Sequence, residues 1–502
     1  MSGPRAGSSL NAARRARELA RTAEERVDVL VVGLGATGAG AALDAASRGL
    51  SVAAIDAHDL AFGTSRWSSK LIHGGLRYLA RGQVGVAYES AVERGVLLTR
   101  TAPHLVRAHP YVLPLTPGVT GAQASLVMSG YVLGDGLRRA AGTPRRLLPG
   151  PSALTAGRAR ELAPALRAGG LRGGLLSWDG RVLDDARLVV AVARTAAARG
   201  ARILTRCRAL ELRADGARVR DELTGEEFGI RARAVVNATG VWAGGLDPRV
   251  RLRPSRGTHL VLAPDTLPGL RAGLHVPIPG ESNRFALVLP QADGRVHVGL
   301  TDVAVDGPVP DVPQAPEEDV RTLLDVLNGV LEIDVPRHVV AGAYAGLRPL
   351  LAAEGAAGGR TADLSRRHAV LSSDGIVTVV GGKLTTYRRM AEDAVDRAVA
   401  VRGLRAGPSR TAVIPLVGAG RPAAGVPRRL AERYGAEAAA VQPLVAAHPE
   451  PVGLGLTLGD LLWSVRHEGA LDAGDLLDRR TRIGLVAADR ERALELAEGA
   501  SG

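Results

Sequence analysis

A glycine loop near the start of the chain, Gly33-Leu34-Gly35-Ala36-Thr37-Gly38, constrains the fold more than any other feature. It follows an apolar run, residues 27–32, that predicts a buried strand, and it precedes an alanine-rich segment, residues 39–48, that predicts a helix. A second apolar run, residues 51–56, completes a βαβ unit. Glycines at this spacing let the backbone turn tightly and approach a pyrophosphate, which the N-terminus of the following helix attracts.

The loop predicts a dinucleotide site, with a tight βα turn that binds nothing as the structural alternative. Asp56 ends the second predicted strand, where a carboxylate can accept hydrogen bonds from ribose hydroxyls. The loop alone does not separate FAD from NAD. The cofactor contacts expected from this unit are Gly33, Gly35, Ala36, Thr37, Gly38 and Asp56.

Length and composition indicate a soluble globular protein. A chain of 502 residues with 46% hydrophobic and 23% charged residues can form roughly two to four domains. Residues 1–26 are rich in arginine and lack the apolar stretch of a secretory signal, so we expect a solvated basic tail or a short helix there. Cys207 is the only cysteine, which excludes an intramolecular disulfide and favours the cytoplasm.

The net charge of +13 is compatible with nucleic acid, anionic lipid or acidic metabolites as partners, and also with a bias of composition toward arginine. Aromatic residues make up only 3% of the chain, which argues against base stacking and therefore against nucleic acid. The chain holds just two lysines, Lys70 and Lys383. Because lysine delivers a compact point charge that arginine does not reproduce, both are candidates for a specific role.

Strand patterns followed by glycine recur at three distant places, before Gly33, Gly240 and Gly381. This recurrence predicts one nucleotide-binding domain assembled from separated segments. Helices are expected at 84–100, 186–199, 427–433 and 487–496, and strands at 202–205, 209–212, 234–237 and 376–380, with further short strands between 259 and 301. The expected division is a tail at 1–26, a nucleotide domain at 27–85, 170–245 and 360–400, a β-rich substrate domain at 86–169 and 246–359, and a helical C-terminal domain at 405–502.

Three motifs carry a resemblance to a known family. Residues 64–79 combine hydroxyls, cations, a histidine and paired glycines, residues 235–242 read VVNATGVW, and residues 381–388 read GGKLTTYR. Together they closely resemble the FAD-dependent glycerol-3-phosphate dehydrogenases, and residues 475–482, DLLDRRTR, resemble the helical C-terminal domain of that family. The resemblance implies an α/β fold with a Rossmann-like FAD-binding domain built from discontinuous segments, a β-rich substrate domain and a small C-terminal helical domain.

The resemblance also implies which residues contact FAD. The segment 64–79 would serve as a cofactor loop, although a solvated structural loop could be equally polar. Further expected cofactor contacts are Thr64, Ser65, Ser68, Ser69, Lys70, Leu71, His73, Gly74, Gly75, Ala209, Ala238, Thr239, Gly240, Trp242, Gly346, Gly382, Lys383, Leu384, Thr385 and Thr386. Asp184 and Asp185 resemble a family signature at a helix start, where we expect them to cap the helix.

Catalysis is expected from His259, Arg348 and Lys383. His259 matches a family Gly-Ser-His segment and could accept the hydroxyl proton of the substrate, although a lone histidine in an apolar strand is more often a core residue. Arg348 matches a Gly-x-Arg-Pro-Leu element, and an arginine fork suits a phosphate. The substrate-binding residues implied by the resemblance are Arg77, Tyr78, His259, Arg348, Arg366 and Lys383.

The expected reaction is the oxidation of sn-glycerol 3-phosphate to dihydroxyacetone phosphate, with electrons passed to a membrane quinone. The expected state is a homodimer bound peripherally to the cytoplasmic face of the cell membrane, where the basic balance suits an anionic lipid surface. Oxygen is the rival electron acceptor, an amino acid the rival substrate, and a non-enzymatic flavoprotein the rival class. No cluster of Cys and His has metal-ligand spacing, so no metal is expected.

Overall fold

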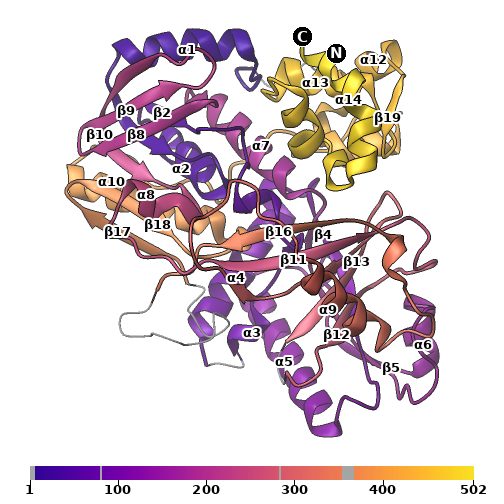
Figure 1. Cartoon of the computed structure of the whole chain (residues 1–502). Helices are drawn as coiled ribbons and strands as arrows, with labels where there is room; N and C mark the ends of the chain where they lie inside the picture. Colours follow the sequence, from indigo (N-terminus) through magenta and orange to yellow (C-terminus); the bar gives the residue numbers. More distant parts are fainter. Residues whose placement is uncertain (1–5, 80–81, 282–283, 353–366) are drawn as a thin grey trace.

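The computed structural model describes residues 6–79, 82–281, 284–352 and 367–502. Two large β-sheets form the body of the molecule, and the last hundred residues form a separate group of helices (Figure 1). The predicted architecture is confirmed: an α/β part built from distant segments, a β-rich part and a helical C-terminal part.

The first sheet is built from strands that lie far apart in the sequence, in the order β17-β18-β10-β1-β2-β7. The strands are β1 (Val27–Val32), β2 (Val52–Ile55), β7 (Arg202–Leu204), β10 (Glu227–Asn237), β17 (Ala369–Ser373) and β18 (Ile376–Val380). All neighbours run parallel except β17, which is antiparallel to β18. Val32 pairs with Asn237, and Asn237 pairs with Thr378, so the three glycine turns that follow these strands lie at one edge of the sheet.

Both faces of this sheet are covered, which explains why every residue of β1 except Asp28 is apolar and buried. Val29 and Val31 belong to a core shared with helices α2 (Ala36–Ser47), α7 (Asp185–Ala197) and α10 (Tyr387–Arg402). Leu30 and Val32 belong to a core on the opposite face, which includes the antiparallel strands β8 (Cys207–Arg213) and β9 (Gly216–Asp221).

The N-terminal segment is not a solvated tail over most of its described length. Helix α1 (Ala12–Glu24) begins at Asn11, whose side chain accepts a hydrogen bond from the Arg14 amide, and it packs against β7 and β10. Arg15 is buried, donates to the carbonyl of Thr205 at 2.7 Å and pairs with Asp221. The expected tail is therefore wrong for this segment, because an amphipathic helix covers the edge of the sheet, while the alternative of a short helix is confirmed.

The second sheet has the order β15-β11-β14-β13-β12-β4-β6-β3, with β16 paired to β11 and β5 paired to β6. Its strands are β3 (Leu71–Ile72), β4 (Val106–Pro114), β5 (Ser152–Leu154), β6 (Gly174–Val182), β11 (Ser255–Leu262), β12 (Gly273–Pro277), β13 (Phe285–Pro290), β14 (Val296–Gly299), β15 (Val303–Ala304) and β16 (Val340–Arg348). Helix α9 (Glu317–Asn328) buries Leu323 and Leu327 against Leu260 and Val298 of this sheet.

One expected boundary needs correction. Strands β3 and β6 fall within ranges expected for the nucleotide domain, yet β6 pairs along its length with β4 and also pairs with β3, so both belong to the second sheet. The chain returns from the second sheet to the first after β6 ends at Val182, through α7, which begins at Asp185. Backbone pairing between distant strands decides this assignment, and local composition does not report it.

The helices beside the second sheet were only partly expected. The helix predicted at 84–100 is α4 (Val84–Val96), followed by a wide helical turn, η2 (Leu97–Thr101). Helix α5 (Gly121–Ala140) was not expected, and it begins with a capping box formed by Thr120 and Gln123. The remaining short elements outside the C-terminal part belong to both sheets: η1 (Thr64–Arg66), α3 (Leu76–Leu79), α6 (Ala156–Leu162), η3 (Gly240–Trp242), α8 (Ala243–Leu246), η4 (Arg337–Val339) and η6 (Leu384–Thr386).

The C-terminal part is helical, as expected, with one short hairpin. Its elements are α11 (Arg428–Tyr434), η7 (Gly435–Glu437), α12 (Ala438–Ala447), β19 (Pro451–Gly453), β20 (Leu456–Thr457), α13 (Leu458–His467), η8 (Asp475–Arg480), η9 (Ile483–Leu485) and α14 (Ala487–Ser501). Buried ion pairs between Arg194 and Glu437 and between Arg187 and Glu468 join this part to α7. Within the described ranges, the helices are too short or too polar to cross a bilayer.

Candidate active site

A cavity of about 940 Å³ is lined by residues of both sheets. From the first sheet it takes the turns after β1, β2, β10 and β18, and from the second sheet it takes side chains of β11 and β16. Ligand sites in open α/β sheets lie at this carboxyl edge, and their volumes fall between roughly 300 and 1,000 Å³. The cavity is therefore large enough for a dinucleotide and a small substrate together.

The glycine loop forms one wall of the cavity and has no room for a side chain at Gly33 or Gly38. Gly33 has a φ of +99°, and a Cβ atom there would lie 2.6 Å from the carbonyl oxygen of Ala238, while a Cβ at Gly38 would overlap the carbonyl of Gly33. Helix α2 starts at Ala36, whose amide donates to the Oγ of Ser65 at 2.9 Å. This cradle of bare backbone at a helix N-terminus fits the pyrophosphate of the predicted cofactor.

Asp56 lies at the end of β2 on the cavity wall. Its carboxylate accepts hydrogen bonds from the amides of Leu34 at 2.6 Å and His58 at 2.8 Å. Burial raises the pKa of Asp56 to about 6, although the two amides favour the charged form. The carboxylate is thus held in place by backbone amides beside the cavity, where the ribose of a dinucleotide is expected.

Most of the expected cofactor contacts line the cavity. Those that do are Gly33, Gly35, Ala36, Thr37, Asp56, Thr64, Ser65, Ser68, Ser69, Leu71, His73, Ala209, Ala238, Thr239, Gly240, Trp242, Gly346, Gly382, Lys383, Leu384 and Thr385. Gly38, Lys70, Gly74, Gly75 and Thr386 lie behind this wall. Among these, Gly74 donates its amide to Asp179, which itself lines the cavity and is paired with Arg94 at 2.6 Å.

Lys70 points away from the cavity. Its Nζ atom lies 2.7 Å from the carboxylate of Asp185, and both side chains are buried. The same carboxylate accepts hydrogen bonds from the amide and hydroxyl of Ser68. Asp184 caps α7 by accepting from the amide of Arg187, as expected, whereas Asp185 holds the cofactor loop in shape.

His259 lies on β11 between the cofactor loop and the second sheet. Its Nε2 atom is 2.8 Å from the Oγ of Ser69, and its ring stacks on Tyr344 with centroids 4.8 Å apart. A Cβ at Gly299, which is the cross-strand neighbour of His259, would overlap the imidazole. Burial, with Lys70 and Arg348 nearby, lowers the pKa of His259 to about 3, so the ring is neutral and can accept a proton.

Arg348 lies at the end of β16, where Ser255 is its cross-strand neighbour. Its guanidinium donates to the Oγ of Ser255 at 3.0 Å, to the carbonyl of Thr301 at 3.2 Å and to Asp302 at 3.3 Å. A Cβ at Gly257 would overlap this guanidinium. Three acceptors from the second sheet therefore orient one side of the arginine fork while the residue lines the cavity.

Lys383 enters the cavity from the other sheet, after the glycine turn that follows β18. Its Nζ atom lies 4.2 Å from the ring centroid of Tyr78 and donates to the Oγ of Ser90. Tyr78 is buried and also lines the cavity. The structure thus brings His259, Arg348, Lys383 and Tyr78 to one cavity, whereas Arg366 and the side chain of Arg77 lie outside the described residues.

Three side chains that shape this site were not expected from the sequence: Tyr344 beneath His259, Asp302 beside Arg348, and Asp179 on β6. Alternation along a strand was the available signal for Tyr344. Alternate residues of β16 share one face: Tyr344, Gly346 and Arg348. Their cross-strand partners on β11 are His259, Gly257 and Ser255, respectively. Asp302 and Asp179 follow from pairing between distant segments, so no local pattern marks them.

The comparisons with known proteins agree with this geometry. Residues 28–388 match the family model described as FAD dependent oxidoreductase. The chain is 53% identical over 504 residues to glycerol-3-phosphate dehydrogenase 1 of Mycobacterium tuberculosis, with 98% of each chain covered. It is 37% identical to the glycerol-3-phosphate dehydrogenase of Mycobacterium leprae, covering 95% of this chain and 84% of that protein. The solved glycerol-3-phosphate dehydrogenase of Bacillus halodurans, in complex with FAD, superposes with a TM-score of 0.75 at 27% identity, covering 98% of this chain and 94% of that chain.

Proposed function

Since the chain belongs to the FAD-dependent glycerol-3-phosphate dehydrogenases, a branch of the FAD-dependent oxidoreductase family, we propose that it oxidises sn-glycerol 3-phosphate to dihydroxyacetone phosphate and passes the electrons to a membrane quinone. The observation that carries the proposal is the meeting of His259, Arg348 and Lys383 on the cavity that the glycine loop also lines. A base, a phosphate-binding fork and a point charge are the groups that this oxidation needs.

FAD, when bound, supplies the acceptor for the hydride that leaves the secondary carbon of the substrate. The protein must therefore take the hydroxyl proton, and neutral His259 can accept it at Nε2, the atom that faces Ser69. A phosphate dianion in the same cavity opposes the burial effect and raises the pKa of His259, because negative charge favours the imidazolium. Substrate binding thus makes the base stronger when it is needed.

Arg348 is the proposed phosphate ligand. Its guanidinium is already oriented by Ser255, Thr301 and Asp302, so little side-chain entropy is lost when an anion binds. Lys383, coming from the opposite sheet, places a positive charge where the substrate oxygen or the reduced cofactor carries negative charge. Arg77 and Arg366 stay predictions as further phosphate ligands.

An exposed apolar face beside the cavity supports the membrane part of the proposal. On α5, Leu126, Val132 and Leu133 are 62%, 57% and 62% exposed, and Leu126 and Leu133 also line the cavity. Arg139 is exposed in the last turn of the same helix. An apolar helix face with a nearby cation suits an anionic bilayer on the cytoplasmic side, and it would bring a quinone dissolved in the lipid close to the cavity.

Anaerobic addition of glycerol 3-phosphate to the FAD-loaded protein tests the proposed reaction. The absorbance of the oxidised flavin should bleach with this substrate and stay constant with glycine or proline. An unchanged spectrum with glycerol 3-phosphate would contradict the proposal. Bleaching by glycine or proline would indicate an amino acid as the substrate. Reoxidation by a soluble quinone analogue without release of peroxide separates the dehydrogenase from an oxidase, and size-exclusion chromatography tests the homodimer.

A further inference from the structure

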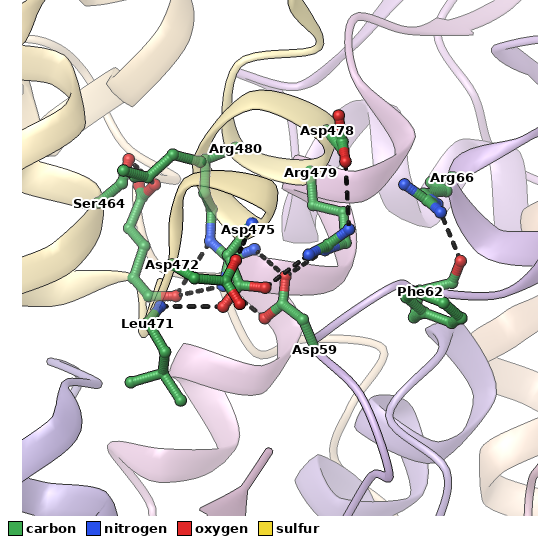
Figure 2. A network of polar contacts seen from close by, with 12 residues as sticks. Asp59, Phe62, Arg66, Ser464, Leu471, Asp472, Asp475, Asp478, Arg479 and Arg480 are labelled. Carbon is green, nitrogen blue, oxygen red and sulfur yellow. Dashed lines mark hydrogen bonds and ion pairs between the residues drawn. The ribbon is translucent and has the colours of Figure 1, made fainter. Parts of the chain in front are cut away.

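The loop at 56–70 forms much of the cavity wall, yet it is held from behind by the C-terminal part of the chain. Its cavity side presents Asp56, Phe62, Ser65 and Trp67. Its far side contacts residues 475–482, more than 400 positions later in the sequence, through the polar network drawn in Figure 2. The C-terminal helices are therefore in direct contact with the loop that lines the cofactor site.

Asp59 is the centre of this network (Figure 2). Its carboxylate accepts hydrogen bonds from the Nε of Arg479 at 2.6 Å and from both terminal nitrogens of Arg480 at 2.7 and 2.8 Å. All three side chains are buried. Burial alone would raise the pKa of Asp59, but the guanidinium groups of Arg480 and Arg479 hold the pKa well below its usual range, so the carboxylate stays ionised.

The arginines are themselves fixed within the C-terminal part. Arg480 also donates to the carbonyl of Glu468 at 2.9 Å, and Arg479 donates to Asp475. Asp475 in turn accepts from Arg206, whose own amide donates to the carbonyl of His58 at 2.8 Å. The network thus reaches the 56–70 loop along two routes, one at Asp59 and one at His58.

A further contact fixes the same loop at Arg66 and Trp67. Arg482 donates to the carbonyl of Arg66 at 2.7 Å, and its guanidinium lies 5.8 Å from the ring centroid of Trp67. Arg66 donates to the carbonyl of Phe62 at 2.8 Å and lies over the rings of Phe62 and Trp67. The two aromatic rings that line the cavity are therefore packed from behind by guanidinium groups.

None of Asp59, Arg479, Arg480 and Arg482 is among the residues that line the cavity. A buried ion network of this kind is a poor source of net stability, because two isosteric apolar groups would cost less desolvation. It does impose one geometry on the two segments that it joins. Its position therefore indicates a role in shaping the cofactor loop.

We propose that Asp59, Arg479, Arg480 and Arg482 are positioning residues for FAD, through which docking of the C-terminal part sets the affinity for the cofactor. The loop binds FAD well only while these side chains hold it. Linkage makes the effect reciprocal, so bound FAD also strengthens the docking of residues 475–482 onto the loop. The inference concerns cofactor binding and is independent of the electron acceptor.

The test compares Asp59→Asn with a matched control, Glu437→Gln. The Asp59→Asn substitution keeps the size of the side chain and removes its negative charge. Glu437 forms a buried two-point pair with Arg194, at 2.6 and 2.8 Å, across the same junction with the C-terminal part, but neither residue lines the cavity or is hydrogen-bonded to the 56–70 loop. FAD binding to each apo protein is measured by calorimetry, after circular dichroism has established the folded fraction.

Loss of charged hydrogen bonds should raise the FAD dissociation constant of Asp59→Asn by about tenfold or more, with less than about a twofold change in Glu437→Gln. Saturating FAD should restore kcat with a dye acceptor, and the KM for glycerol 3-phosphate should stay at the wild-type value. A dissociation constant that is unchanged in Asp59→Asn, or raised equally in both variants, overturns the proposal.

A milder variant covers the case in which Asp59→Asn does not fold. Arg482→Lys keeps a positive charge near Asp185 but shortens the reach to the Arg66 carbonyl, so it should weaken FAD binding by about threefold, a loss below one charged hydrogen bond. Hydrogen exchange of the wild-type protein gives an independent readout. FAD should slow the hydrogen exchange of the amides at 475–482. An exchange rate at these amides that is the same with and without FAD contradicts the proposed linkage.

Discussion

The Oγ atom of Ser69 lies 2.8 Å from the Nε2 atom of His259, so the loop that lines the cofactor site and the strand that carries the proposed base meet in one hydrogen bond. Ser69 follows Ser68, which is bonded to Asp185, and His259 is supported by the ring of Tyr344. Both partners are thus fixed before substrate arrives. This contact gives the base a defined orientation relative to the cofactor.

Replacing His259 with glutamine removes the base while keeping a polar side chain opposite Ser69. The rate of flavin reduction by glycerol 3-phosphate should fall by roughly 100-fold to 10,000-fold, the usual contribution of a general base. Stopped-flow absorbance under anaerobic conditions measures this rate. FAD affinity should stay at the wild-type value, and a reduction rate that does not change would assign proton removal to another group.

Replacing Arg348 with lysine removes the planar fork and keeps the charge. We expect the KM for glycerol 3-phosphate to rise by about 10-fold to 100-fold, because a charged hydrogen bond contributes about 1.5–3 kcal/mol. Steady-state assays with a dye acceptor give the KM. Arg337→Lys is the control, since Arg337 pairs with Glu317 at the surface, and equal effects in both variants would remove Arg348 from the phosphate site.

The two lysines should respond differently to replacement by methionine. Lys383→Met should lose turnover and retain FAD, because its ammonium lies on the cavity wall. Lys70→Met should instead lower the free energy of unfolding by about 3 kcal/mol, because the buried carboxylate of Asp185 loses its nearest cation and keeps only Arg482 at 3.6 Å. Turnover numbers, bound flavin and urea unfolding of the two variants check the contrast, which fails if Lys383→Met unfolds or Lys70→Met keeps full stability.

Asp56 should give FAD binding a pH dependence. The folded apo protein holds the pKa of Asp56 at about 6, above the usual value of 3.8, so the carboxylate is ionised above pH 6 and protonated below it. Ribose hydroxyls donate to the ionised form, and FAD affinity should therefore fall as the pH is lowered through 6, by at most about tenfold per pH unit. Fluorescence titration between pH 5 and 8 measures this, and Asp56→Asn should flatten the curve.

The exposed face of α5 can be tested apart from catalysis. Val132→Asp should reduce binding to vesicles that contain anionic lipid by about tenfold, because burying an apolar side chain contributes about 1.5–3 kcal/mol. Leu223→Asp is the control, since Leu223 is 56% exposed in the turn between β9 and β10, close to the 57% of Val132. Flavin reduction in solution should not change in either variant. Vesicle binding that is lost equally in both would exclude α5 as the docking surface.

Patterns within short segments of the sequence were sufficient to predict individual strands and the turns that follow them. The run of β-branched residues gave β1 as Val27–Val32 to the residue, and the three strand-glycine turns meet at one sheet edge as expected. Helix α5 was missed because its exposed face carries Leu126, Val132 and Leu133, so its apolar residues do not follow the usual one-sided period. Sequence alone could not assign β6, because only its pairing with β4 decides the sheet.

The site divides in the same way. His259, Arg348 and Lys383 were expected from motifs, and the structure brings all three to one cavity. The partners that orient them were not expected, since Tyr344, Asp302 and Asp185 become neighbours only through strand pairing and helix packing. The contacts of Asp59 with Arg479 and Arg480 could not be predicted at all. More than 400 residues separate the partners, and no motif distinguishes any of them from the other charged residues of its segment.

The order of strands in the first sheet has a consequence for synthesis in the cell. The strands β1 and β2 are synthesised first, but the last parallel strand, β18, ends at Val380. Most of the chain must therefore be synthesised before this sheet can be completed. Such long-range pairing is slow and leaves apolar strand edges exposed in nascent chains. We therefore expect fragments that end before β18 to aggregate, and recombinant production to improve at low temperature or with added chaperones.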